Sequence, residues 1–305
     1  MFSVSSFLSP TAWYRYDGKT NKTQKTKLSS KSKVDFSDIE VVREFTKSKD
    51  GTRVPINILR KKGIKLRGQH TALLTGYGGY GFSYGPYFDP GLRIWFDEGG
   101  VFAIANIRGG GEYGEKWHKD GMLMKKQNSF DDFYACMRYL VESGHTTEEK
   151  LAIEGGSNGG LLMGAMITQH PEAMKAVVSH VGIYDMLRSE LSSNGKFNIP
   201  EFGTVKNKAN FSAMYAYSPY HNVKERTLYP SVLFLTGAND ARVDPMHSRK
   251  MTAILQANNS SDNPILLRTN ANTGHGGGTP LKERIEQQTD VLTFLFHQLG
   301  MSEPE

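Results

Sequence analysis

Residues 151–166 read LAIEGGSNGGLLMGAM. The pattern predicts a short apolar strand from Leu151 to Glu154, a tight glycine-rich turn around Ser157 and a helix that begins near Leu161. A strand, a G-x-S-x-G turn and a helix together are the context in which a serine serves as a nucleophile. The glycines let the serine adopt a strained backbone, because side chains beside it would clash with the neighbouring strand or helix. Ser157 is therefore the predicted nucleophile of a serine hydrolase.

Short apolar strands alternate with helical stretches from residue 71 onward. Strands that are not alternating in polarity and are separated by helices are typical of a parallel sheet covered on both faces. The sequence predicts an α/β fold of the α/β-hydrolase type, with a mostly parallel central sheet. The expected strands are 72–74, 101–105, 151–154, 176–178, 232–235 and 265–267, and the clearest helices are 130–143, 161–169 and 280–299.

The first 60 residues have a different pattern. Residues 13–16 predict a short aromatic strand before an Asp-Gly turn, and Lys19 to Lys33 predicts a weak strand or a linker. Residues 41–45 and 54–59 alternate in polarity on either side of another Asp-Gly turn, which favours an antiparallel hairpin. We therefore expect a short N-terminal β extension, residues 1–39, followed by a catalytic domain, residues 40–305.

Composition limits the possible cofactors and locations. The chain of 305 residues contains one cysteine, Cys136, so an intrachain disulfide is impossible, and a buried structural thiol is expected. Metal-binding spacings such as C-x-x-C and H-E-x-x-H are absent, and nothing implies a cofactor. No apolar run approaches the roughly 20 residues that span a bilayer, and residues 1–10 do not resemble a secretory signal. We expect no membrane partner and take a cytoplasmic location as the default.

The net charge of +6 is unevenly distributed. Residues 1–70 carry a net charge of +10, and the remaining 235 residues carry −4. A basic excess in a polar N-terminal stretch is typical of a solvated, flexible surface, and the catalytic part of the chain is slightly acidic. A nucleic-acid partner is therefore not expected.

A serine hydroxyl needs a base and an acid to become a strong nucleophile. His275 lies in a glycine-rich loop after the last expected strand, and none of the other eight histidines combines this chain order with such a loop. Asp240 follows the strand before it, and Asp244 is the alternative acid, although it could instead cap a helix that begins near Met246. The chain order of Ser157, Asp240 and His275 is that of the α/β-hydrolases.

An oxyanion hole needs two hydrogen-bond donors. The backbone N–H of Asn158 follows the nucleophile and supplies the first. The second is expected from the loop after an early strand, where residues 75–81 read TGYGGYG. Tyr77 could donate its phenolic O–H there, and the alternative is a glycine-rich turn whose tyrosines pack at the surface.

These motifs resemble the catalytic domain of the prolyl oligopeptidase family over roughly residues 40–300. The resemblance rests on YGGYG at 77–81, NIRGGGEYGE at 106–115, GGSNGG at 155–160, NDARV at 239–243 and GHG at 274–276. It implies that Tyr77 and the backbone of Asn158 bind the oxyanion, and that Arg242 holds a carbonyl of the bound peptide. It also places five residues around the pocket for the residue before the cut, namely Tyr80, Asn158, Ile183, Phe202 and Val243. From the residues alone, Arg242 could equally form a surface ion pair with Asp240 or Asp244.

The chain departs from the family pattern in two ways. Family members usually carry an N-terminal β-propeller of several hundred residues, whereas here only residues 7–33 are available for it. Within them, residues 13–18 resemble the end of a last propeller blade. A relative without the propeller, or a truncated form, would expose apolar surface over its site or cover it by forming a homo-oligomer. Prolyl enzymes also stack the substrate proline on a tryptophan, whose position here holds Asn198. An amide cannot supply this stacking, so a relaxed proline preference is expected unless Phe197 or Phe202 substitutes.

Three functions follow from these observations. The first is a serine peptidase that cleaves small peptides through an acyl-enzyme. The second is an esterase or general acyl hydrolase with an open, uncapped site, because the same three residues serve both reactions. The third, an inactive binding module, is disfavoured. An intact triad on a strained serine turn costs free energy, which is not expected in a protein that catalyses no reaction.

Overall fold

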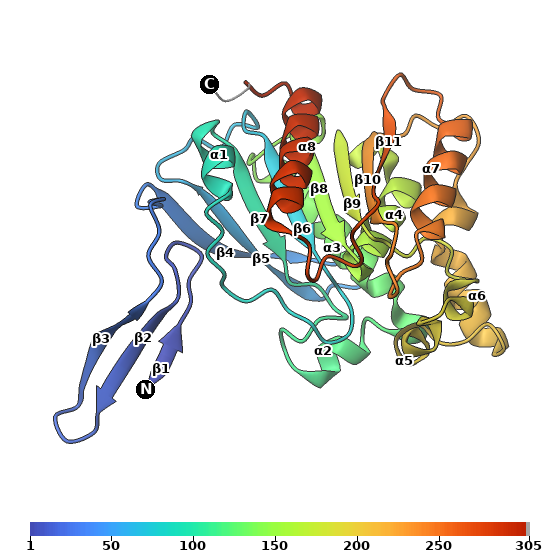
Figure 1. Cartoon of the computed structure of the whole chain (residues 1–305). Helices are drawn as coiled ribbons and strands as arrows, with labels where there is room; N and C mark the ends of the chain where they lie inside the picture. Colours follow the sequence, from blue (N-terminus) through green and yellow to red (C-terminus); the bar gives the residue numbers. More distant parts are fainter. Residues whose placement is uncertain (303–305) are drawn as a thin grey trace.

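The computed structural model of this chain describes residues 1–302 and contains two separate β-sheets (Figure 1). The smaller sheet is antiparallel and projects away from the main body; its strands are β1 (Phe2–Val4), β2 (Ala12–Asp17) and β3 (Lys22–Ser29). The predicted aromatic strand at 13–16 lies within β2. The segment from Lys19 to Lys33, for which a linker was the other expectation, contains an eight-residue strand.

The larger sheet has eight strands in the order β11-β10-β9-β8-β6-β7-β5-β4. The hairpin formed by its first two strands is antiparallel, β5 is antiparallel to β7, and all the other neighbouring pairs are parallel. A mostly parallel sheet was predicted and is confirmed. Its strands are β4 (Ile39–Lys47), β5 (Arg53–Lys61), β6 (Ala72–Gly76), β7 (Val101–Ala105), β8 (Leu151–Gly156), β9 (Ala176–His180), β10 (Ser231–Gly237) and β11 (Ile265–Asn270).

Helices cover both faces of this sheet (Figure 1). Neighbouring strand residues point to opposite faces, so Leu74 packs in one core with α3, α4 and α7, whereas Leu73 packs in a second core with α1 and α8. Cys136 is fully buried on α3, as predicted. The helices are α1 (Leu92–Asp97), α2 (Glu115–Lys119), α3 (Gln127–Glu142), α4 (Asn158–Gln169), α5 (Ile199–Phe202), α6 (Lys208–Tyr217), α7 (Met246–Asn258) and α8 (Leu281–Leu299). None of the helices described between residues 1 and 302 is long and apolar enough to cross a membrane.

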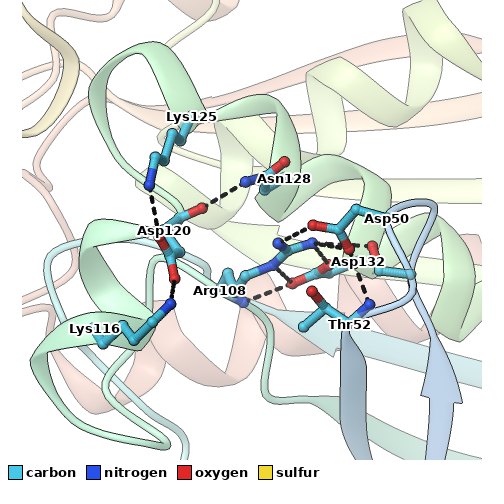
Figure 2. A network of polar contacts seen from close by, with 9 residues as sticks. Asp50, Thr52, Arg108, Lys116, Asp120, Lys125, Asn128 and Asp132 are labelled. Carbon is cyan, nitrogen blue, oxygen red and sulfur yellow. Dashed lines mark hydrogen bonds and ion pairs between the residues drawn. The ribbon is translucent and has the colours of Figure 1, made fainter.

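The motif at residues 106–115 is anchored by a buried arginine. Arg108 donates from Nε and Nη2 to Asp132 on α3, over 2.9 and 2.6 Å, and from Nη1 and Nη2 to Asp50 in the β4–β5 turn, over 2.5 and 3.1 Å (Figure 2). The next carbonyl, that of Gly109, accepts a 3.0 Å hydrogen bond from the backbone N–H of Gly81. The arginine therefore ties the turn and α3 to the loop that contacts the end of segment 77–81.

Parallel strands place their carboxyl ends along one edge of the sheet, where binding sites of α/β proteins form. Strands β6, β8, β9, β10 and β11 all end at this edge. The residues that follow them are Tyr77, Ser157, Val181, Ala238 and Ala271. The parallel pairing therefore brings the predicted nucleophile, base, acid and oxyanion loop to the same part of the molecule.

Candidate active site

Ser157 lies on a sharp turn between β8 and α4. Its backbone angles are φ 58° and ψ −116°, a conformation that residues other than glycine rarely adopt. A Cβ atom on Gly155 would lie 2.6 Å from the carbonyl oxygen of Gly159, and one on Gly159 would lie 2.8 Å from that of Gly76. The turn therefore requires glycine on both sides of the serine, as the sequence pattern indicated.

Asp240 and His275 form a direct contact at the ends of β10 and β11. Asp240 Oδ2 lies 2.7 Å from His275 Nδ1, while Oδ1 accepts hydrogen bonds from the backbone N–H groups of Arg242 and Val243 over 2.8 and 2.9 Å. Burial would raise the pKa of Asp240, but the hydrogen bonds from His275 and Val243 outweigh it and lower the pKa below its usual 3.8. The carboxylate is held charged and oriented toward the imidazole.

Asp244, the alternative acid, makes a different contact. Its Oδ1 accepts a 2.9 Å hydrogen bond from the backbone N–H of Met246, the first residue of α7. It makes no hydrogen bond with His275. The carboxylate therefore stabilises the start of α7, which is the capping alternative that the sequence allowed.

Ser157 and His275 line one cavity of about 520 Å³, together with Tyr77, Tyr80 and Arg242. Within residues 1–302, no hydrogen bond joins the Ser157 hydroxyl to the imidazole. Hydrogen bonds of this kind are often long without substrate and shorten when substrate binds. Both side chains nevertheless face the same cavity.

Tyr77 lines the same cavity as Ser157. The pKa of the Tyr77 phenol is raised, chiefly because the phenol is buried. A hydrogen bond with the Ser157 hydroxyl opposes the rise, and the negative charge of Glu201 adds to it. A phenol with a raised pKa stays protonated at neutral pH and can donate a hydrogen bond. The backbone is held as well, because Asn158 Nδ2 donates to the Tyr77 carbonyl. These contacts do not fit a tyrosine that only packs at the surface.

The remaining predicted substrate residues fall into two groups. Tyr80 and Arg242 line the cavity, whereas Asn198 does not line it and accepts a 2.8 Å hydrogen bond from the Tyr80 hydroxyl. Three others are buried in the core and do not line the cavity, namely Ile183, Phe202 and Val243. The Asn158 side chain is likewise buried, against Gly79. Phe197 is 77% exposed, and Phe202 meets Tyr80 edge-on at 5.9 Å between ring centroids.

Arg242 is exposed at the cavity and contacts Asp240 only through its backbone N–H. In the part of the chain that the structure describes, its guanidinium forms no ion pair with Asp240 or Asp244. The surface ion pair that the sequence allowed as the alternative role of Arg242 is thus not formed. The five fixed donors of the guanidinium remain available to a carbonyl or carboxylate in the cavity.

Sequence reasoning assigned no role to His180, which also lines the cavity. Its Nε2 lies 2.8 Å from Glu154 Oε1, and its Nδ1 lies 3.2 Å from Gln287 Nε2. Both ring nitrogens are therefore engaged, unlike the Nε2 of His275. Its position at the end of β9 was the available signal, since parallel strands end at the site. Across residues 1–302, no group of three or more histidine, cysteine or acidic side chains is placed to hold a metal ion.

The mostly parallel sheet and the strained serine turn after β8 define an α/β-hydrolase fold. The chain belongs to the prolyl oligopeptidase family, whose model matches residues 86–302. It is 40% identical over 303 residues to a prolyl endopeptidase of Elizabethkingia meningoseptica, covering 98% of this chain and 43% of that protein. It is 36% identical to a dual function macrocyclase-peptidase of Galerina marginata, covering 98% of this chain and 42% of that one.

Solved structures give the same result. One from a study of two prolyl endopeptidases superposes with a TM-score of 0.94 at 42% identity, covering 98% of this chain and 44% of that one. Oligopeptidase B from Leishmania major has a TM-score of 0.91 at 28% identity, covering 98% and 42%. The chain thus spans less than half the length of the relatives that it matches.

Proposed function

We propose that this chain carries a serine peptidase site that cleaves small peptides through an acyl-enzyme, with Ser157 as nucleophile, His275 as base and Asp240 as acid. The observation that carries the proposal is the 2.7 Å contact of Asp240 with His275, at a cavity that Ser157 also lines. This contact fixes which imidazole nitrogen holds a proton, so the other nitrogen is free to accept one.

The reaction follows from these positions. Ser157 Oγ attacks the carbonyl carbon as His275 Nε2 takes its proton, and the former carbonyl oxygen becomes negative. The Tyr77 phenol and the Asn158 backbone N–H donate hydrogen bonds to that oxygen. The C–N bond then breaks, the amine leaves with the proton from His275, and water hydrolyses the acyl-enzyme by the same route.

Relatives and local contacts support a peptide as the substrate. Relatives that match nearly the whole chain are named prolyl endopeptidases, and one solved relative holds a 35-residue substrate. Arg242 presents donors suited to a peptide carbonyl. A relaxed proline preference is proposed because Asn198, at the stacking position, is engaged by Tyr80 and provides no aromatic face. The side chains of Ile183, Phe202 and Val243 would form the base beneath this pocket.

We also propose that residues 1–39 form the end of a propeller blade and a linker, apart from a catalytic domain at 40–305. Trp13, Tyr16 and Leu28 of the small sheet are exposed. Such apolar side chains are typical of a surface that another element or a second copy covers.

The test compares turnover of a proline-containing peptide amide with that of a short-chain aryl ester. The peptidase proposal expects amide cleavage that Ser157→Ala abolishes. Ester turnover without detectable amide cleavage would instead favour the esterase alternative, and activity retained by Ser157→Ala would remove the mechanism. No turnover of either substrate would favour the inactive module.

A further inference from the structure

Lys126 is a lysine whose side chain is almost wholly buried, with 1% of its surface exposed. It directly precedes α3. Its Nζ donates to the carbonyl oxygen of Gly78 over 2.8 Å and to Glu201 Oε1 over 3.0 Å, and it lies 5.1 Å from the ring centroid of Phe202. Neither Lys126 nor Glu201 lines the cavity.

A buried ammonium is costly unless it is paired and hydrogen-bonded. Burial lowers the pKa of Lys126, and the negative charge of Glu201 opposes this change. Glu201 is equally buried, and its second oxygen, Oε2, lies 2.8 Å from His118 Nε2. Such pairs are often no more stable than apolar side chains of the same volume, so stability alone does not account for this one.

The carbonyl that Lys126 reaches belongs to the loop carrying Tyr77. Gly78 adopts φ +67°, and the two successive carbonyls of this loop are each held by a buried side chain. Asn158, next to the nucleophile, holds that of Tyr77, and Lys126 holds that of Gly78. The two peptide planes that follow Tyr77 are thus fixed from the protein interior, the first directly at the Tyr77 Cα atom and the second across Gly78.

The same contacts extend to the segment that contains Asn198 and α5. Glu201 lies on α5, which directly follows Asn198, and Asn198 accepts the hydrogen bond of Tyr80. The loop from Tyr77 to Tyr80 is therefore joined to this segment twice, once in the interior through Lys126 and once at the surface.

We propose that Lys126, with Glu201 as its counter-charge, is a positioning residue that holds the Gly78 carbonyl and thereby keeps the Tyr77 phenol aimed at the oxyanion. The proposal rests on the role given to Tyr77 in the proposed function. Lys126 touches no reacting atom and acts only through the loop.

The experiment is a double-mutant cycle of Lys126→Met and Tyr77→Phe. The readout is the reaction of Ser157 with a fluorophosphonate, in which His275 Nε2 takes the hydroxyl proton, the Oγ–P bond forms, the P–F bond breaks and fluoride leaves. This reaction develops negative charge on the phosphoryl oxygen without requiring peptide specificity. The test can therefore be carried out even if the chain cleaves no peptide. Rates at several reagent concentrations separate the maximal inactivation rate from reagent binding.

Lys126→Met should lower the maximal inactivation rate roughly tenfold or more, with reagent binding little changed, because a misplaced donor fails chiefly in the transition state. In the Tyr77→Phe background the same substitution should cost less than about twofold, because the donor that it positions is already absent. An equal loss in both backgrounds, or a loss confined to reagent binding, would overturn the proposal.

Two further variants guard against a folding defect. Lys126→Met/Glu201→Gln removes both charges, so it should regain thermal stability relative to Lys126→Met while its reaction stays slow. Lys250→Met removes the partner of buried Asp185, a pair away from the Tyr77 loop. It should lose stability and keep the rate of the unmodified protein. Recovery of the rate in the charge-free double variant would show that only folding had been lost, and would contradict a positioning role.

Discussion

The hydroxyl of Tyr80, a residue that lines the cavity, donates a 2.8 Å hydrogen bond to Asn198 Oδ1. Tyr80 takes a left-handed backbone angle, φ 55°, at the end of the loop that carries Tyr77. Asn198 stands where the family resemblance places a tryptophan. An amide that accepts from a tyrosine offers a polar contact where an indole would offer a flat apolar face.

Asn198→Trp should therefore increase selectivity for proline before the cut. An added aromatic contact of about 0.5–1.5 kcal/mol corresponds to a rise of roughly 2- to 10-fold. The measurement is the ratio of kcat/KM for two peptides that differ only in proline or alanine at that position. Phe197→Trp is the matched control, since that side chain is 77% exposed and should leave the ratio unchanged. A parallel change for both peptides would contradict the stacking argument.

Asp240→Asn should lower kcat far more than Asp244→Asn does. Loss of the carboxylate that orients His275 should lower kcat by about 10,000-fold, because the imidazole then takes the wrong tautomer. Asp244→Asn should change kcat only slightly, since the side chain contacts the N–H of Met246 rather than the base. The measurement is kcat for the two variants, with thermal unfolding as the check on folding. A larger kcat loss at Asp244 would exchange the two assignments.

Tyr77→Phe should lower kcat by roughly 100- to 1000-fold, the usual effect of removing one oxyanion donor, with KM little changed. The hydrogen bond is made to a charge that exists only in the transition state, so ground-state binding is unaffected. Tyr84→Phe is the control, because this tyrosine lines the same cavity but is not part of the proposed oxyanion hole. An equal loss in the control would argue against a specific role for Tyr77.

The stability of the fold should fall as the pH drops below about 6.5, in part because of His247. Burial lowers its pKa from 6.5 to about 4, and its Nδ1 accepts hydrogen bonds from the N–H groups of Tyr184 and Asp185. The unfolded chain binds a proton near pH 6.5, whereas the folded ring resists protonation until about pH 4. The contribution of His247 to the free energy of unfolding, roughly 3 kcal/mol at most, is therefore fully present above pH 6.5. It is lost as the pH falls from 6.5 to about 4.

His247→Asn should reduce that pH dependence, because an amide oxygen can accept in place of Nδ1 and does not titrate. Urea unfolding at pH 7 and pH 5 measures the difference in free energy of unfolding. His297→Asn, at an exposed position on α8, is the control and should keep the slope of the unmodified protein. An unchanged slope in His247→Asn would assign the acid sensitivity to other groups.

Local patterns predicted most of the sheet. Strand β7 was expected at residues 101–105 and lies there, and the helix expected at 280–299 begins at Leu281. The placement of Asp240 and His275 after the last two strands followed from chain order, because the carboxyl ends of parallel strands meet at one edge. The strand in segment 19–33 was less certain, since its side chains are mostly polar and exposed and give no period-2 signal.

The sequence by itself therefore determined the α/β architecture, the serine turn and the chain order of the residues around it. These depend on residues close together along the chain and on a general rule of parallel sheets. The tertiary structure alone decided which side chains lie beneath the site. Lys125 and Lys126 are adjacent, yet Lys125 pairs at the surface with Asp120 (Figure 2), whereas Lys126 is buried against Gly78 and Glu201. Those partners lie 48 and 75 residues away, so no local pattern distinguishes the two lysines.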